Sequence, residues 1–486
     1  MKRVCSFVFR TGFVAILLAA LIGLAVGQAE ACVWYVKQGP RSGGGTAWTD
    51  PVPTIGEAVA AAQEGDTIWV TEGEYLIEEP IRITKRLNIY GGFLGVEQHP
   101  DERVGNLRTI IDGGDSTACM AVSADTLLDG IDFFECNSSV NYGTGGKDLN
   151  KYLPGPAITA ENAKLVMRNC ALHKNTGPAH GAMRVVNCQV DICDIRITNS
   201  IASEIPAAVS GGMYLENCTG RIRQALIRST SSAYSGGMYA KEGSLLVDRC
   251  QFIGNTAGRG PGGGLHIVGE HTVQDSLFLN NAALWGGAGY FNGTTVNRCR
   301  MVGNSAWGSD GAFSASNAKL YNCVIHNNDG EHDALGELYS SSLVNSTIVE
   351  RASNGSILSV GSSRIANSII LSTDGGPVFS GLRNTSVIYS LISGGHPGEG
   401  NIDADPLFVA PESFNFKLQA ASPAVNAGTE NIPDLPDTDY TGKLRNMGSA
   451  PDMGAYELSQ LPMDVLSRLL LPSQLDSEWN AGGEGS

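Results

Sequence analysis

The chain has 486 residues, of which 61 are glycine and 17% are charged, and its formal net charge is −16. The high glycine content and the low charge favour a turn-rich all-β protein over a helical one. The acidic balance argues against nucleic acid and anionic membrane surfaces as partners, because both would be repelled.

Residues 1–31 have the pattern of a secretory signal peptide. Basic residues precede the apolar run "FVAILLAALIGLAVG", and an A-x-A cleavage motif follows it. We expect an exported chain that begins at Cys32. Cleavage would remove three positive charges and one negative charge, which shifts the net charge from −16 to −18. A lipid anchor on Cys32 is the less favoured alternative, because Ala29 and Glu30 make a poor lipobox. No later stretch is long and apolar enough to predict a membrane-spanning helix in the mature chain.

Residues 32–112 are interpreted as an N-terminal cap followed by the first coils of a solenoid. Thr54 and Glu57 have capping-box spacing before an alanine-rich segment, which predicts a short helix. Such a helix would cover the open end of the first coil, where unpaired strand edges invite aggregation.

An insertion, "NSSVNYGTGGKDLNKYLPGP", interrupts the pattern between Gly130 and Cys170. Loops that project from one face of a solenoid commonly form its binding site. The predicted ligand-binding residues in this loop are Tyr142, Lys147, Lys151 and Tyr152; a loop without a function is the alternative. Just beyond it, His173 and Lys174 are weak candidates for a catalytic base, because no carboxylate cluster accompanies them.

Residues 113–398 repeat a short phrase of small residues, an apolar strand, a Cys or Ser, an apolar pair and then Asn. Aligned copies place a Cys or Ser at one position every 22 to 26 residues. The members are Cys250, Ser276, Cys299, Cys323, Ser346, Ser368 and Ser390, with Cys170 and Cys193 expected to extend the row upstream. A fixed period of this length indicates a solenoid, and the short aliphatic segments indicate strands. We predict an all-β fold, a parallel β-helix of about 13–14 coils.

Two further expectations concern side chains inside and at the corners of the coils. The cysteines of the repeated position should be reduced, buried and stacked, because free cysteine behaves as a small apolar residue. Cysteines outside that row are the better disulfide candidates, with the pairing left open: Cys119, Cys136, Cys188 and Cys218. Asn255, Asn281, Asn304 and Asn328 should stack with amide-to-amide hydrogen bonds along the rod.

The phrases "GGMY", "GGGLH" and "GGAGY", alternating with "FIGN" and "FLNN", resemble the repeats of polymorphic outer-membrane proteins. Those proteins belong to the wider group of right-handed parallel β-helix, pectate-lyase-like proteins, so the resemblance implies a right-handed coil but no particular activity. Residues 399–457 resemble the closing segment of bacterial β-helix proteins called choice-of-anchor Q, through "DPLF", "SPAVNAG" and "DMGAYE". Residues 458–486 are interpreted as a tail with one short amphipathic helix.

Two groups of charged residues in the repeats are further site candidates. Arg223, Arg249, Arg298 and Arg300 could form a basic stripe that meets a carboxylated sugar; a solvated face with local ion pairs is the favoured alternative. Asp329, Glu331 and Asp333 in "HNNDGEHDALGE" offer hard oxygen ligands that suit Ca²⁺, whereas a solvated loop is the simpler interpretation.

Polysaccharide lyases need a base and a neutralised carboxylate, and glycoside hydrolases need two opposed carboxylates. Neither pattern is recognisable. The predicted function is therefore that of a secreted or cell-surface protein that binds extracellular polysaccharide, or another surface partner, without cleaving it. A divergent polysaccharide lyase, with or without calcium, and a purely structural rod are the alternatives.

Overall fold

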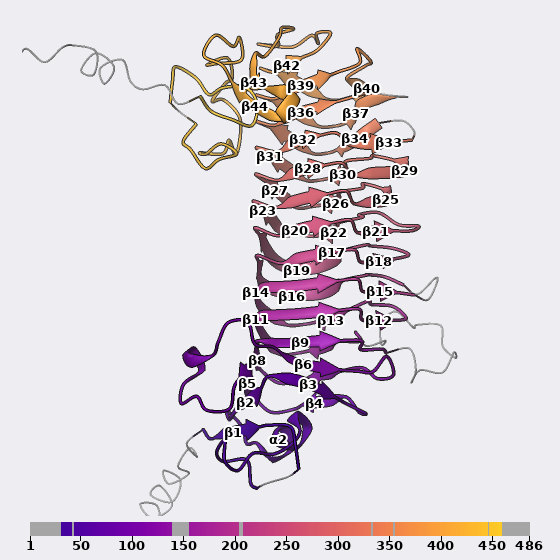
Figure 1. Cartoon of the computed structure of the whole chain (residues 1–486). Coiled ribbons are helices and arrows are strands. Elements are labelled where there is room, and N and C mark those ends of the chain that lie inside the picture. Colours follow the sequence, from indigo (N-terminus) through magenta and orange to yellow (C-terminus); the bar gives the residue numbers. More distant parts are fainter. Residues whose placement is uncertain are drawn as a thin grey trace, which may run out of the picture.

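The computed structural model describes residues 31–40, 43–138, 155–203, 208–331, 334–352, 355–445 and 447–458. These residues form a long solenoid of parallel strands, with a helix at the N-terminal end and a partly irregular segment at the C-terminal end (Figure 1). Within the described ranges, no helix is long and apolar enough to cross a membrane. The loop residues Tyr142, Lys147, Lys151 and Tyr152, residue Asp333 and nearly all of the predicted signal peptide and tail lie outside these ranges.

Each coil contributes strands to three long parallel ladders and to one short ladder, and several strands bend across two ladders. The first ladder contains β1 (Val33–Val36), β2 (Thr67–Thr71), β5 (Leu87–Phe93), β8 (Thr126–Asp129), β11 (Lys164–His173), β14 (Gln189–Thr198), β16 (Met213–Arg223), β19 (Met238–Asp248), β23 (Thr272–Gln274), β27 (Thr295–Asn297), β31 (Lys319–Tyr321), β35 (Ser342–Val344), β38 (Arg364–Ala366) and β41 (Ser386–Ile388).

The second ladder contains β3 (Gly73–Leu76), β6 (Thr109–Asp112), β9 (Ile131–Phe134), the second halves of β11 and β14, β17 (Leu226–Arg228), β20 (Gln251–Ile253), β24 (Leu277–Leu279), β28 (Arg300–Val302), β32 (Val324–His326), β36 (Thr347–Glu350), β39 (Ile369–Ser372) and β42 (Leu391–Ile392).

The third ladder contains β4 (Ile81–Ile83), β7 (Met120–Val122), β10 (Ile158–Glu161), β13 (Met183–Val186), the first halves of β16 and β19, β22 (Leu265–Val268), β26 (Gly289–Asn292), β30 (Phe313–Ser316), β34 (Ala334–Tyr339), β37 (Ser356–Gly361) and β40 (Phe379–Arg383). The short ladder contains β12 (Thr176–Gly177), β15 (Ile201–Ala202), β18 (Ser231–Ser232), β21 (Thr256–Ala257), β25 (Ala282–Trp285), β29 (Ser305–Ser309) and β33 (Asp329–Gly330).

The predicted all-β parallel β-helix is confirmed, with about 12 turns instead of the predicted 13–14. The difference arises upstream, where coils are longer than the repeat suggests. Equivalent residues are 39 apart across the insertion, as Asp129 and Arg168 are, and 30 apart between Asn187 and Asn217. A longer coil consumes more chain for the same rise of roughly 4.8 Å.

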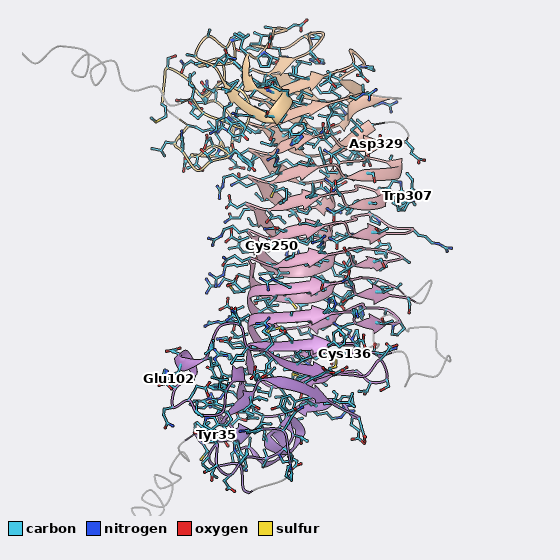
Figure 2. All side chains as sticks on the ribbon, viewed as in Figure 1. Tyr35, Glu102, Cys136, Cys250, Trp307 and Asp329 are labelled. Carbon is cyan, nitrogen blue, oxygen red and sulfur yellow. A yellow bond between two sulfur atoms is a disulfide. The ribbon has the colours of Figure 1, made fainter. Side chains whose placement is uncertain are left out.

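The interior of the rod contains the expected row of small side chains. Cys250, Cys299 and Cys323 are buried and reduced, and Figure 2 shows Cys250 within the column of coils. The serines of the row accept hydrogen bonds from the backbone of the coil before them, as Ser346 Oγ does from Cys323 N at 3.1 Å. The position therefore selects a small side chain that fits beside its copies one rung away.

The upstream part of that row contains one wrong prediction. Cys170 pairs with Ile195, so Ile195 and not Cys193 occupies the next interior position. Equivalent residues are 25 apart in this coil, as Asn175 and Ser200 are, which is two more than the spacing of 23 between Cys170 and Cys193. Cys193 is consequently displaced to a partly exposed position.

One disulfide forms among the cysteines outside the row. Cys119 is bonded to Cys136, whereas Cys188 and Cys218 are buried free thiols on neighbouring coils. The Sγ of Cys188 donates to Val186 O at 3.2 Å. Two of the four disulfide candidates thus behave as small interior residues.

The asparagine row forms the continuous hydrogen-bonded ladder that the sequence predicts. Each Nδ2 donates to the Oδ1 of the next asparagine at 2.9 Å, from Asn255 to Asn281, Asn304 and Asn328. The last amide, Asn328 Nδ2, donates to the buried carboxyl of Glu350 at 2.7 Å. This ladder satisfies polar groups inside the coil corner, where water is excluded.

The two ends of the rod are covered differently. At the N-terminal end lies α2 (Ile55–Ala61), whose N-cap Thr54 accepts a hydrogen bond from Glu57 N at 3.2 Å. The predicted short capping helix is therefore confirmed. Two 3₁₀ helices and one antiparallel strand pair lie outside the ladders. They are η1 (Pro100–Glu102), η2 (Pro411–Ser413), β43 (Phe408–Ala410) and β44 (Asn415–Leu418).

The segment after residue 399 packs against the flank of the last coils, to the left of the upper strands in Figure 1. Phe408, Phe416 and Met453 form a cluster with Ile369 and Leu391 of the rod. The buried Arg445 donates to Asn322 Oδ1 at 3.1 Å and lies 3.6 Å from the Glu457 carboxylate. The closing segment is thus anchored by a small apolar core and by the polar contacts of the buried Arg445.

Replacing Cys299 by leucine should lower the free energy of unfolding by about 1–3 kcal/mol, because a larger side chain overpacks a position stacked between Ser276 and Cys323. Chemical denaturation measures this change. Cys193→Leu is the matched control and should have little effect, since its side chain is partly exposed. Equal losses in the two variants would contradict the assigned interior row.

Candidate functional site

A row of aromatic side chains lies on the outer face of the third ladder. The in-register pairs Tyr214–Tyr239, Tyr239–His266 and His266–Tyr290 place these side chains on successive coils. We call these four residues the aromatic column. Each follows a pair or triplet of glycines, and at Gly237 a Cβ would lie 2.3 Å from Gly264 O of the next coil. The glycines therefore allow the coils to approach and keep the rings aligned.

The rings of the aromatic column contact one another along the rod. Tyr214 and Tyr239 stack with centroids 5.5 Å apart, Tyr239 and His266 are 4.6 Å apart, and His266 and Tyr290 are 4.9 Å apart. Tyr234 adds an edge contact to Tyr239 at 5.9 Å. The result is a continuous aromatic strip that runs across coils in the direction of the rod axis.

This strip lines part of a groove of about 640 Å³. Tyr234 and Trp285 stand at its side and are 43% and 42% exposed, so they present ring surface to solvent. Beyond Tyr290 the lining becomes polar, with Ser314, Asp310 and Glu337. No lysine or arginine is among the described residues that line the groove.

His266 is the polar group at the centre of the strip. It is 3% exposed, and its Nδ1 has no hydrogen-bond partner among the described residues. Burial lowers the pKa of His266 to about 3, so the imidazole is neutral at ordinary pH. A neutral imidazole offers one donor and one acceptor, which suits a hydroxyl ligand. Burial also raises the pKa of Tyr239 to about 12, which keeps its phenol neutral.

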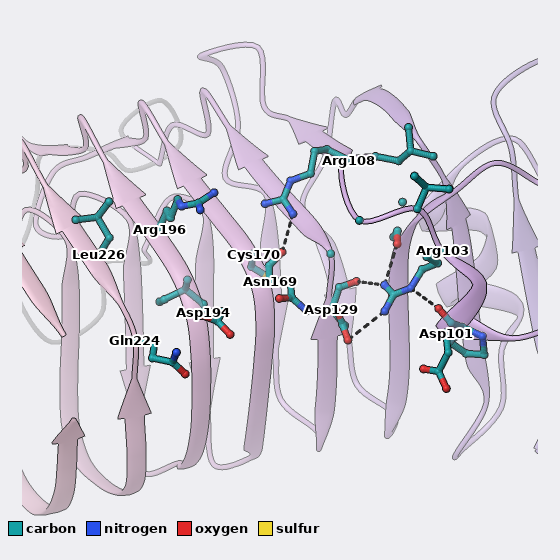
Figure 3. A pocket seen from close by; sticks show the side chains of 18 of the residues that line it. Asp101, Arg103, Arg108, Asp129, Asn169, Cys170, Asp194, Arg196, Gln224 and Leu226 are labelled. Carbon is teal, nitrogen blue, oxygen red and sulfur yellow. Dashed lines mark hydrogen bonds and ion pairs between the residues drawn. The ribbon is translucent and has the colours of Figure 1, made fainter. Parts of the chain in front are cut away.

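A second groove, of about 630 Å³, lies between the loop that contains η1 and the corners of the coils (Figure 3). Arg103 Nη2 lies 3.3 Å from Asp129, and its Nη1 donates to Gly91 O at 3.0 Å. Arg108 forms a two-point ion pair with Asp132 and donates to Asn169 O at 3.1 Å. These bonds fix the loop to the coils and engage both guanidinium groups.

Arg196 is the third arginine of that groove and is exposed. It forms no ion pair with the residues that the structure describes. Arg196 is thus the one arginine in the described lining of this groove that has no ion pair, whereas Arg103 and Arg108 are bonded to the coils. The aromatic groove, with its aligned rings and an unpartnered buried imidazole, is the stronger binding site.

The four arginines of the expected basic stripe do not occupy one row. Arg249 and Arg298 are equivalent, as predicted, but Asp275 lies between them on the intervening coil and forms a two-point ion pair with Arg298 at 2.6 and 2.7 Å. Arg249 pairs with Asp248 at 2.9 Å. Charges of alternating sign therefore follow this row, as in the favoured interpretation of local ion pairs, and they do not form a positive stripe.

The remaining two arginines are also engaged. Arg223 lies 3.5 Å from Asp191. Arg300 donates to His326 Nε2 at 3.1 Å, and burial, with the nearby Arg300 charge, lowers the pKa of His326 to about 4. Ligand binding by these four arginines stays a prediction.

The other sequence candidates lie apart from both grooves. Lys174 is 3.4 Å from Glu135 and lies over the Phe134 ring at 5.1 Å, while His173 Nδ1 is 2.6 Å from Thr198 Oγ1. Asp329 and Glu331 are exposed. Within the described residues no cluster of three or more metal-ligating side chains occurs, and calcium binding stays a prediction.

The aromatic column was missed although its signal is visible in the sequence. The "GGMY", "GGGLH" and "GGAGY" phrases each end on one of its members. The glycines of these phrases indicate the fold, and the signal for the column is that an aromatic residue ends the phrase in each successive coil.

No protein-family model and no curated protein matches this chain. Among solved structures it is similar to the pectate lyase Pel9A, with 13% identity and a TM-score of 0.37 over 89% of this chain and 97% of that one. It is also similar to a variant of the PL6 family alginate lyase AlyGC, with 12% identity and a TM-score of 0.45 over 79% of this chain and 58% of that one. These likenesses are too weak to bear on activity.

Proposed function

We propose that the protein binds extracellular polysaccharide along the third ladder and does not cleave it. The observation that carries this proposal is the aromatic column with its flanking Tyr234 and Trp285. The predicted signal peptide supports this proposal, because export would bring the mature chain to where such polymers occur.

The physical basis is the match between an aromatic ring and the face of a sugar. An aromatic face is electron-rich, and the C–H bonds on a pyranose face carry partial positive charge. Rings repeated at the coil spacing of roughly 4.8 Å can contact several units of one chain, so modest contributions add along the polymer. The neutral His266 and the tyrosine hydroxyls supply hydrogen bonds to sugar hydroxyls.

Alanine at both Tyr239 and Tyr290 should weaken binding at least tenfold, since each lost aromatic contact contributes about 1 kcal/mol. Affinity electrophoresis against a polysaccharide panel measures this effect. Tyr339→Ala is the matched control, because Tyr339 is exposed on the same ladder but does not line the groove.

The panel also separates this function from its rivals. No binding to any polymer would contradict the proposal and favour a purely structural rod. Unsaturated products that absorb in the near ultraviolet would contradict the non-catalytic part and favour a lyase.

A further inference from the structure

The row of outward side chains that forms the aromatic column continues beyond Tyr290 to an acidic residue. Tyr290 pairs with Ser314, and Ser314 pairs with Glu337 on the following coil. Ser314 Oγ donates to Glu337 Oε2 at 2.9 Å, which orients the carboxylate. Glu337 is therefore two rungs, roughly 10 Å, from the last ring of the column. Asp310, a second carboxylate, lines the same end of the groove.

The charged side chains in the described lining of this groove are all acidic. Its described lining contains Asp310 and Glu337 but no lysine or arginine, and Tyr239 and His266 are neutral at ordinary pH. The whole chain carries a net charge of −16, so the surrounding field has the same sign. A polymer of uronic acids would be repelled, whereas a polymer with ammonium groups would be attracted.

Two observations independent of the acids mark this place as a ligand site. Tyr234 and Trp285 present ring surface to solvent beside the groove, and the buried His266, which lines it, has an Nδ1 without a partner among the described residues. A sugar seated on Tyr290 would direct its neighbour toward the Ser314–Glu337 end. A substituent carrying positive charge could there form a charge-assisted hydrogen bond with the carboxylate.

We propose that the aromatic groove selects a cationic amino-sugar polymer, in which rings stack on the aromatic column and an ammonium group pairs with Glu337. This inference rests on the proposed polysaccharide binding and names the class of polysaccharide.

The test compares three β-1,4-linked hexamers in mildly acidic, low-salt buffer by titration calorimetry: glucosamine, N-acetylglucosamine and glucose. The glucosamine hexamer should bind about three- to fivefold more tightly than the other two, because one partly exposed ion pair contributes up to about 1 kcal/mol. Added salt should remove this preference while binding of the glucose hexamer is retained.

Glu337→Gln should abolish the preference without weakening binding of the glucose hexamer. Glu270→Gln, which changes an exposed acid outside the groove lining, is the control and should leave the preference intact. Equal affinity for charged and neutral hexamers would overturn the amino-sugar selectivity and leave polysaccharide binding standing. Binding of the glucosamine hexamer that survives loss of Tyr239 and Tyr290 would show nonspecific attraction and overturn it as well. Binding of none of the hexamers would overturn the selectivity, and the polysaccharide panel then decides whether polysaccharide binding itself survives.

Discussion

Replacing Asn281 by alanine is expected to lower the free energy of unfolding by about 3–5 kcal/mol, although Asn281 contacts no proposed ligand. Its Oδ1 accepts from the backbone N and the Nδ2 of Asn255, at 3.0 and 2.9 Å. Its Nδ2 donates to Phe252 O and to Asn304 Oδ1, both at 2.9 Å. Alanine would leave a buried N–H and a buried carbonyl without partners, where water does not reach.

The neighbouring Asn280 provides the control. It is exposed and has a φ of 54°, a left-handed conformation that glycine adopts without strain. Asn280→Gly should therefore change stability by less than about 0.5 kcal/mol. Urea denaturation of both variants measures the difference, and a loss below about 1 kcal/mol for Asn281→Ala would show that the ladder is not a main source of stability.

The second large effect is a loss of stability in alkaline solution that depends on Glu350. This side chain is 2% exposed and ends the asparagine ladder, where Asn328 N and Nδ2 donate to its carboxyl oxygens. Burial raises the pKa of Glu350 from 4.5 to about 8, against the opposing effect of the Asn328 hydrogen bonds. Such a shift corresponds to roughly 4–5 kcal/mol of linked free energy.

The direction follows from which state holds the proton. Below pH 4.5 both states are protonated and the contribution is fully present. As pH rises from 4.5 to about 8, the unfolded chain releases a proton that the folded chain retains, so the contribution is lost. Between about pH 5 and pH 9 the unmodified protein should therefore lose roughly 3–4 kcal/mol more than Glu350→Gln.

Comparing the two proteins at each pH isolates Glu350 from Glu457, whose pKa burial also raises to about 8. Thermal or urea denaturation across this pH range gives the two curves. Parallel curves would mean that the Glu350 carboxyl is already ionised in the folded protein at neutral pH.

The sequence alone determined the repeating interior. A coil has one small inward position and one corner asparagine, and each must match its own copy one rung away. The period of Cys250, Ser276 and Cys299 and the spacing of Asn255, Asn281 and Asn304 therefore predicted both rows correctly. The prediction was wrong at Cys193, because the coil that contains it is longer than the spacing from Cys170 to Cys193. Cys193 therefore does not lie at the inward position.

Only the tertiary structure decided what the outer faces do. Outward side chains need not match their copies, so sequence spacing does not reveal which neighbour a charge will meet. Arg249 and Arg298 occupy equivalent positions, as the spacing predicts, but only the structure shows that Asp275 on the coil between them forms the ion pair with Arg298. On the coils after Arg298, the same position is occupied by Asn322, Asn345 and Asn367. Arg445 donates to Asn322, and Asn367 Nδ2 donates to Thr429 O at 2.9 Å. Both partners lie far along the chain from these asparagines. The aromatic column likewise depends on in-register pairing of the third ladder, since its rings are separated by a full coil of sequence and meet only when the coils stack.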